Sequence, residues 1–381
     1  MREKLLSYPA KLLELLINTR LFKTIISSYF LSTLALVAIV VFWSFPSYDV
    51  VLRTNEMGNN WDAVFIQGAQ PFVNHHTNHL YGPHSDNIAF RFVPAVILNF
   101  LHIYTVIPGL IFQFFTLVLF YYLLLLVFNS FFNDRAKSFI FILPICFVVA
   151  GHVYGSDYRG VFDTLSLDFL LMTLLLRNKI YVIIPLLLAY FSDERALIVS
   201  PAIFLFNMID NNSFDDFKSI LKGALFSSSI CLFVSWGVYF VIRYSLHNAF
   251  GLYTGTGAEN LFFAQINKLF NTFYIGLEGF IIPFVLVVIA LFRKRIYMFP
   301  TLLIMTFLLL LFISQSLVDR NRSMSYDILI LILILILLDK LFPKEEAFRI
   351  VALVILINLV YDDFYPLLPQ LYRMKFITHS I

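Results

Sequence analysis

The sequence predicts an all-helical protein that spans a membrane many times, and three observations lead to this fold class. Of the 381 residues, 60% are hydrophobic, whereas about 45–50% is usual for soluble domains. Only 13% are charged, against a usual share of about 25%. The apolar residues also form long continuous runs, such as LILILILILL before Asp339, and such runs are typical of membrane-spanning helices.

This composition excludes several classes of protein. The mean hydropathy is +0.83 and there are 44 phenylalanines. The chain therefore has too little polar surface for a soluble enzyme, a nucleic-acid-binding protein or a disordered chain. The net charge of +3 does not indicate a polyanionic partner. No repeat or Gly/Ser-rich linker divides the sequence, so we expect residues 1–381 to form one integral membrane domain.

The N-terminal part predicts a helix on the membrane surface followed by a span. Residues 1–24 combine five Lys and Arg residues with leucine pairs at helical spacing, a pattern typical of interfacial amphipathic helices. The apolar segment 25–45 is about as long as a bilayer crossing requires, and no small-residue cleavage site follows it. Residues 46–106 then predict a large first loop outside the membrane, with an in-plane helix at 92–104.

The remaining apolar segments predict about eleven spans in total. Those between residues 165 and 209 are shorter than a full crossing, so we expect them to be half-buried or re-entrant helices shielded by the bundle. The predicted spans after the first are 107–128, 138–154, 165–176, 180–192, 196–209, 222–243, 273–292, 298–316, 325–341 and 350–367.

The distribution of basic residues predicts the orientation. With a cytoplasmic N-terminus, 17 of the 27 Lys and Arg residues fall on the cytoplasmic side, including the run Arg293-Lys294-Arg295. This bias follows the positive-inside rule. The expected location is a plasma membrane of bacterial inner-membrane type.

Most of the other polar residues gather at the ends of spans that this topology places outside. They form four clusters, in the first loop and at three later turns. The clusters are Asp49, Glu56, Asp62 and Asp86 with four histidines; Asp157, Arg159 and Asp163; Asp193, Glu194 and Arg195; and Asp319, Arg320, Asn321 and Arg322.

Each of the later clusters has two interpretations. The turn Asp193-Glu194-Arg195 lies between two short apolar segments, so it is either a solvated turn or the wall of a polar cavity. Asp163 and its neighbours form either an internal ion-pair network or a functional site. Arg320 and Arg322 belong either to a plain surface loop or to a phosphate site, because a guanidinium matches phosphate oxygens.

Histidines in the first loop raise the question of a metal. His75, His76 and His79 are followed by His84 and Asp86. No HExxH motif or cysteine pair accompanies them. We therefore predict no metal-ligating residues; contacts with substrate or solvent are the preferred interpretation, although a divalent cation is left open as a cofactor.

This layout resembles the GT-C superfamily of integral membrane glycosyltransferases. The resemblance rests on the first span, the acidic outer loop and the many-helix bundle, and on two short segments, Gly58-Asn59-Asn60-Trp61-Asp62-Ala63 and Phe90-Arg91-Phe92-Val93-Pro94. It implies that Asp62, with Asp49 and Glu56 behind it, is the leading candidate for an acceptor-activating carboxylate. It also implies a lipid-linked sugar donor, a glycan or lipid-linked acceptor, and no nucleic-acid partner.

The same chemistry can be assigned to residues without the resemblance. Transfer of a sugar from a polyprenyl phosphate needs a carboxylate to deprotonate the acceptor hydroxyl and cations to stabilise the departing phosphate. The predicted catalytic carboxylates are Asp62 and Asp157. The predicted substrate-binding residues are Arg91, Arg159, Asp193, Glu194, Arg195, Arg320 and Arg322.

Three other functions compete with this prediction. An O-antigen polymerase or ligase acts on similar lipid-linked sugars, but its large functional loop usually comes late in the chain, whereas the late segment 244–272 is small. A transporter would place its ionisable residues near the bilayer midplane on broken helices. Asp168, Glu278 and Asp327 fall within predicted spans, but most ionisable groups lie at the outer edge and no duplicated halves are apparent. A non-catalytic assembly or anchoring protein is the third alternative.

Overall fold

The computed structural model describes residues 15, 18–44, 61–72, 89–156, 162–176, 180–210, 214, 228–252, 263, 265–316 and 320–360. Over these residues the chain is helical and contains no strand, which confirms the predicted all-helical class. In chain order the elements are α2 (Arg20–Ile26), α3 (Tyr29–Ser44), α5 (Trp61–Ala69), α6 (Phe92–Phe100), α7 (Val106–Phe132), α8 (Arg135–Cys146), α9 (Val149–Ser156), α10 (Asp163–Leu175), α11 (Ile183–Ser192), α12 (Arg195–Val199), α13 (Pro201–Asp210), α15 (Ser228–Phe250), η4 (Ile266–Lys268), α16 (Leu269–Leu277), η5 (Glu278–Phe280), α17 (Ile281–Arg293), α18 (Met298–Gln315), α19 (Arg320–Met324), η6 (Ser325–Asp327), α20 (Ile328–Leu341) and α21 (Lys344–Val360).

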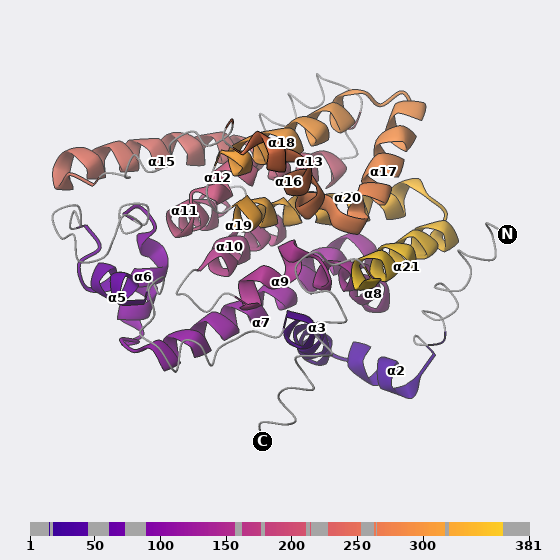
Figure 1. Cartoon of the computed structure of the whole chain (residues 1–381), viewed down its shortest axis with the longest axis horizontal. Coiled ribbons are helices and arrows are strands. Elements are labelled where there is room, and N and C mark those ends of the chain that lie inside the picture. Colours follow the sequence, from indigo (N-terminus) through magenta and orange to yellow (C-terminus); the bar gives the residue numbers. More distant parts are fainter. Residues whose placement is uncertain are drawn as a thin grey trace.

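Helix α20 lies in the middle of the bundle (Figure 1). Every residue from Ile328 to Leu338 is fully buried, as expected of a helix that is apolar on all sides. Helices α8, α13, α17 and α21 pack against it. The run of alternating leucine and isoleucine thus forms the core around which the other helices are arranged.

Four helical segments in the described part of the chain are long and apolar enough to cross a membrane. A fifth crossing results if α2 and α3, which meet at a bend of 113°, are counted together. This bend follows α2 at Ile26 and separates the helix predicted at the membrane surface from the first predicted span. The four segments are Val106–Phe132, Ile230–Phe250, Ile266–Arg293 and Met298–Gln315.

The short predicted spans between 165 and 209 form short helices packed inside the bundle. Helix α10 packs against both α7 and α11. The segments Ile183–Ser192 and Arg195–Ile209 are apolar but shorter than the four long segments. The start of α10 lies beside the end of α11, because Ser166 donates to the carbonyl of Ala189 at 3.0 Å. This end of α11 carries the charged cluster described below.

One predicted span is wrong as a continuous helix. The segment 138–154 divides into α8, which ends at Cys146, and α9, which begins at Val149. Pro144 lies in the last turn of α8, and proline weakens a helix because it lacks an N–H group and crowds the preceding turn. The predicted span 273–292 is also interrupted, at Glu278, whose φ is 43°.

The ion pairs that join different helices of the described bundle lie in two groups, at opposite ends of α20. At its C-terminal end, Lys137 forms an ion pair of 2.5 Å with Asp339, and Lys340 donates to the carbonyl of Ile209 at 3.3 Å. Arg135, two residues before Lys137, donates to the carbonyls of α2 and its C-cap. These segments were all predicted on the cytoplasmic side. The contacts near the start of α20 join segments that were all predicted outside.

Helix α5, from the predicted first loop, is anchored on the bundle through Trp61. The indole is fully buried and meets Phe162, the residue before α10, with ring centroids 5.7 Å apart. It also lies directly on Gly109 of α7, where an added Cβ would come within 2.3 Å of the indole Cζ3. Only a residue without a side chain permits this close approach.

We predict that Gly109→Ala destabilises the protein by about 1–3 kcal/mol, because the methyl group forces Trp61 and α5 away from α7. Thermal unfolding of the detergent-solubilised protein measures the effect. Gly237→Ala is the matched control, because a Cβ at Gly237 of α15 meets nothing within 4 Å. An unchanged unfolding temperature for Gly109→Ala would contradict the proposed packing.

Candidate functional site

A buried ion pair forms where the chain passes from α11 to α12. Asp193 leaves α11 in an extended conformation, with φ −158° and ψ 127°. Its carboxylate accepts from the backbone N–H of Arg195 at 2.9 Å and from Arg195 Nε at 2.8 Å. The guanidinium also reaches the second carboxylate oxygen at 2.5 Å. One aspartate therefore holds both the first backbone N–H and the first side chain of α12.

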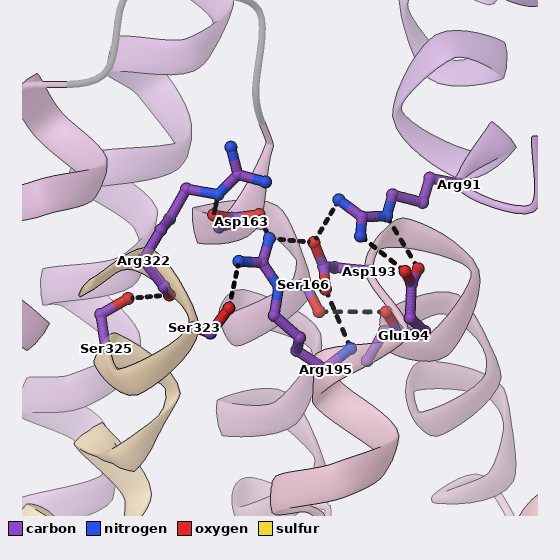
Figure 2. Close-up of polar contacts among 10 residues, drawn as sticks. Arg91, Asp163, Ser166, Asp193, Glu194, Arg195, Arg322, Ser323 and Ser325 are labelled. Atoms are coloured by element: carbon purple, nitrogen blue, oxygen red, sulfur yellow. Dashed lines mark hydrogen bonds and ion pairs between the residues drawn. The ribbon is translucent and has the colours of Figure 1, made fainter. Parts of the chain in front are cut away.

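Arg195 extends this pair to α10 and α19. Its Nη2 donates to Asp163 Oδ1 at 2.8 Å, and its Nη1 donates to the hydroxyl of Ser323 at 3.4 Å. Asp163 Oδ2 in turn lies 2.8 Å from Nε of Arg322. Figure 2 shows Asp163 between the two guanidinium groups. The starts of α10, α12 and α19 are thus joined through a single carboxylate.

Arg91 attaches α6 to the same cluster. Its Nε and Nη2 donate to the two carboxylate oxygens of Glu194 at 2.7 and 2.6 Å, a bidentate pair. Its Nη1 lies 3.0 Å from Asp193 Oδ2. Because bidentate pairs fix both distance and orientation, the beginning of α6 is held against the α11–α12 turn (Figure 2).

The cluster has a buried centre and a partly exposed rim. The side chains of Asp163, Asp193 and Arg195 are 1–4% exposed. At the rim, Arg91 and Arg322 are 16–17% exposed and Glu194 is 32% exposed. The solvated-turn interpretation of residues 193–195 is therefore wrong for Asp193 and Arg195. The three arginines and three carboxylates balance in charge, as buried groups require.

The two central aspartates differ in their affinity for protons. Burial raises the pKa of Asp163 to about 7, against the opposing effect of Arg195 and Arg322. Burial also disfavours the ionised form of Asp193, but Arg195 and Arg91 outweigh it and hold its pKa below the ordinary value. Asp193 is thus the fixed negative charge of the cluster, and Asp163 is the carboxyl that titrates near neutral pH.

Arg320 belongs to a second polar chain beside the cluster. Its Nη1 donates to the hydroxyl of Thr272 at 3.1 Å. Thr272 donates to the side-chain carbonyl of Gln315 at 2.7 Å, and Gln315 donates to the carbonyl of Gln265. This chain joins α16, α18 and α19. The plain-loop interpretation of the Arg320 segment is wrong, because residues 320–324 form α19.

Asp62, one of the two predicted catalytic carboxylates, is not part of the cluster. Asp62 is exposed in the first turn of α5. Its neighbour Trp61 contacts Phe162, which precedes Asp163, so the starts of α5 and α10 are adjacent. Other predicted residues lie outside the described ranges. These are Asp49, Glu56, His75, His76, His79, His84, Asp86, Asp157, Arg159 and Asp319.

The structure brings together five of the predicted substrate-binding residues and adds two others. The sequence analysis placed Asp163 in a polar cluster but did not include it among the predicted site residues. Its position directly before an apolar run was the feature that could have indicated it. No sequence feature indicated Ser323. The five are Arg91, Asp193, Glu194, Arg195 and Arg322.

Within the described ranges, no group of three or more His, Cys, Asp or Glu side chains is arranged to hold a metal ion. The predicted histidine cluster lies outside these ranges. The divalent cation left open by the sequence therefore has no candidate ligand set in the described residues.

Comparisons with known proteins do not identify a relative. No protein family model matches the chain, and no curated protein or solved structure matches it significantly.

We predict that Asp193→Asn destabilises the protein by about 3–5 kcal/mol, because two buried arginines lose a shared negative charge. Thermal unfolding in detergent reports this loss. Glu345→Gln is the control, since Glu345 pairs with Arg349 at 3.7 Å on an exposed helix face and such pairs contribute little. Equal unfolding temperatures for the two variants would show that the buried pair is not a stabilising junction.

The raised pKa of Asp163 predicts a pH-dependent stability. The folded protein binds this proton more tightly than the unfolded chain, whose carboxyl titrates near 3.8. The stabilisation of the folded protein by this tighter proton binding is therefore fully present below about pH 4, and it is lost as the pH rises to about 7. We expect the unfolding temperature of Asp163→Asn to fall less between pH 5 and about 7.5 than that of the unsubstituted protein. Identical slopes would exclude Asp163 as the titrating group, and Asp62→Asn serves as the exposed control.

Proposed function

We propose that the protein is a membrane glycosyltransferase of the GT-C type, which transfers a sugar from a polyprenyl-phosphate donor to a glycan or lipid-linked acceptor outside the membrane. The observation that carries the proposal is the charged cluster at one end of an apolar bundle. Its buried centre fixes the helix starts, and the arginines at its rim, Arg91 and Arg322, are partly exposed. This combination suits an anionic headgroup attached to a lipid tail.

The arginines of α19 supply the phosphate site of this proposal. Asp163 holds Arg322 through Nε, which orients the fork of the guanidinium. Arg320 donates to a neutral hydroxyl, that of Thr272. The guanidinium groups of Arg320 and Arg322 suit the binding of a phosphate and its stabilisation as the leaving group.

The acceptor is activated by a carboxylate from the first loop. Asp62 is exposed, and the contact between Trp61 and Phe162 places its helix beside the start of α10. Asp62 would accept the proton of the acceptor hydroxyl while that oxygen attacks the sugar. Asp157 is the second candidate for this role, and Arg159 a further substrate contact.

The proposed topology has about eleven spans, a cytoplasmic N-terminus, the first loop outside, and a bacterial inner membrane as its location. Its support is the separation of the described ion pairs into two groups. Lys137 pairs with Asp339, and Lys340 donates to the carbonyl of Ile209; all four residues are predicted inside. Arg91 pairs with Glu194, and both are predicted outside.

A transporter remains the second candidate, and one observation favours it. Asp168 and Asp327 are fully buried, and Glu278 nearly so, within or beside predicted spans. Transporters commonly carry such residues on interrupted helices near the centre of the bilayer. Uptake of a solute into sealed vesicles, without release of lipid phosphate from a sugar donor, would favour this function instead.

We predict that Asp62→Asn and Arg320→Ala each reduce sugar transfer by about 100-fold or more while leaving expression and membrane insertion intact. Asp62→Asn removes the base, and Arg320→Ala removes a cation from the leaving group. The measurement is release of polyprenyl phosphate from polyprenyl-phosphate sugars by the purified protein. Glu345→Gln and Arg349→Ala, at the other end of the bundle, are the matched controls.

Full activity of both Asp62→Asn and Arg320→Ala would refute the assignment of the site. Absence of lipid-phosphate release by the unsubstituted protein, over a range of sugar donors and acceptors, would refute the transferase function itself.

A further inference from the structure

Two interrupted helices meet inside the bundle, apart from the charged cluster. Glu278, at the end of α16, accepts from the backbone N–H of Val149, the first residue of α9, at 2.7 Å. The next residue, Gly279, donates its N–H to the side chain of Asn358 at 2.8 Å. Asn358 also donates to the carbonyl of Pro144 at 3.5 Å. Side chains thus satisfy the backbone groups that the interruptions expose.

A second carboxyl group points toward the junction of these two interrupted helices. Asp327, the last residue of η6, is fully buried. Neither of its oxygens has a hydrogen-bond partner among the described residues. A Cβ on Gly276 would lie 3.2 Å from Asp327 Oδ2, so the carboxyl points at α16 two residues before Glu278.

The arginines on the neighbouring elements are engaged in the charged cluster or its neighbouring chain. Helices α9, α12, α16, α18, α19 and α20 pack against η6. Among these, Arg195 contacts Asp163 and Asp193 and also lies 5.2 Å above the ring of Tyr326. Arg320 donates to Thr272, and Arg322 pairs with Asp163. The acidic and histidine side chains at this end of these elements are the buried His152 of α9 and Glu278.

Two carboxylates cannot both stay ionised in apolar surroundings without a nearby positive charge. Glu278 receives an N–H donor at the beginning of a helix, an arrangement that favours its negative charge. Asp327 receives none in the described structure. A metal ion would need a fuller ligand set, and the described residues contain no group of three suitable side chains. The missing positive charge is therefore best supplied by a proton.

We propose that Asp327 is a proton-binding site within the membrane-embedded bundle, paired with the carboxylate of Glu278. A proton from water adds to one oxygen of Asp327 and gives the neutral acid. Release of that proton restores the carboxylate. The inference does not depend on the proposed transferase activity, because none of the residues assigned to that activity takes part.

Infrared spectroscopy of the purified protein in lipid tests the proposal directly. At neutral pH we expect the carbonyl stretch of a protonated carboxylic acid, shifted in D2O and lost in Asp327→Asn. The substitution is nearly isosteric with the neutral acid, so folding should be preserved. Glu345→Gln, which removes an exposed carboxylate, should leave the band intact. Asp168 is as deeply buried as Asp327 and could give a carboxylic-acid band of its own. The Asp168→Asn variant identifies that band by removing it.

A second measurement uses only the unsubstituted protein. Raising the pH should remove the Asp327 band while the helical circular dichroism is retained. An Asp327→Asn spectrum that keeps every protonated-carboxyl band would overturn the proposal. A metal-ion site would also overturn the proposal. It would be recognised by the absence of the protonated-carboxyl band, together with thermal stabilisation by Na⁺ or Mg²⁺ that is lost in Asp327→Asn.

Discussion

The buried pair between Asp193 and Arg195 is the interaction on which the arrangement of this end of the bundle depends. It forms within three residues of sequence, yet its further contacts reach α6, α10 and α19. In an apolar bundle, helices gain little from burying one hydrophobic surface against another instead of against lipid. Hydrogen bonds and ion pairs, which are directional, therefore largely determine where each helix begins. Asp193 supplies such contacts to two arginines at once.

The class of the fold and the location of the main cluster could be predicted from the sequence. Composition and continuous apolar runs identify membrane helices without reference to tertiary contacts. The charged turn at Glu194 stood out because its flanking apolar segments are too short to raise it out of the bilayer. Burial of Arg195 follows from the same argument, since a charge in such a place needs partners.

Other features depend on contacts between distant residues, and the sequence does not reveal them. Asp163 occupies its place because α10 packs against α11, a relation that no local pattern encodes. The interruption between α8 and α9 depends on Glu278, more than one hundred residues later in the chain, as a partner for the exposed N–H of Val149. Ser323 accepts a hydrogen bond from Arg195, a contact between residues more than one hundred positions apart. Asp62, by contrast, was predicted from its position in the first loop and from the family resemblance, and it lies exposed on α5, outside the charged cluster.

The charge balance of the cluster also determines how a ligand would reach it. Three positive and three negative groups packed within hydrogen-bonding distances cancel one another's field a short way from the protein. Such a site exerts little long-range attraction on anions dissolved in water, so electrostatic steering contributes little to their capture. A ligand confined to the bilayer meets the site by two-dimensional diffusion instead. Its rate of encounter would depend on its density in the membrane and on the fluidity of the lipid, and only weakly on ionic strength.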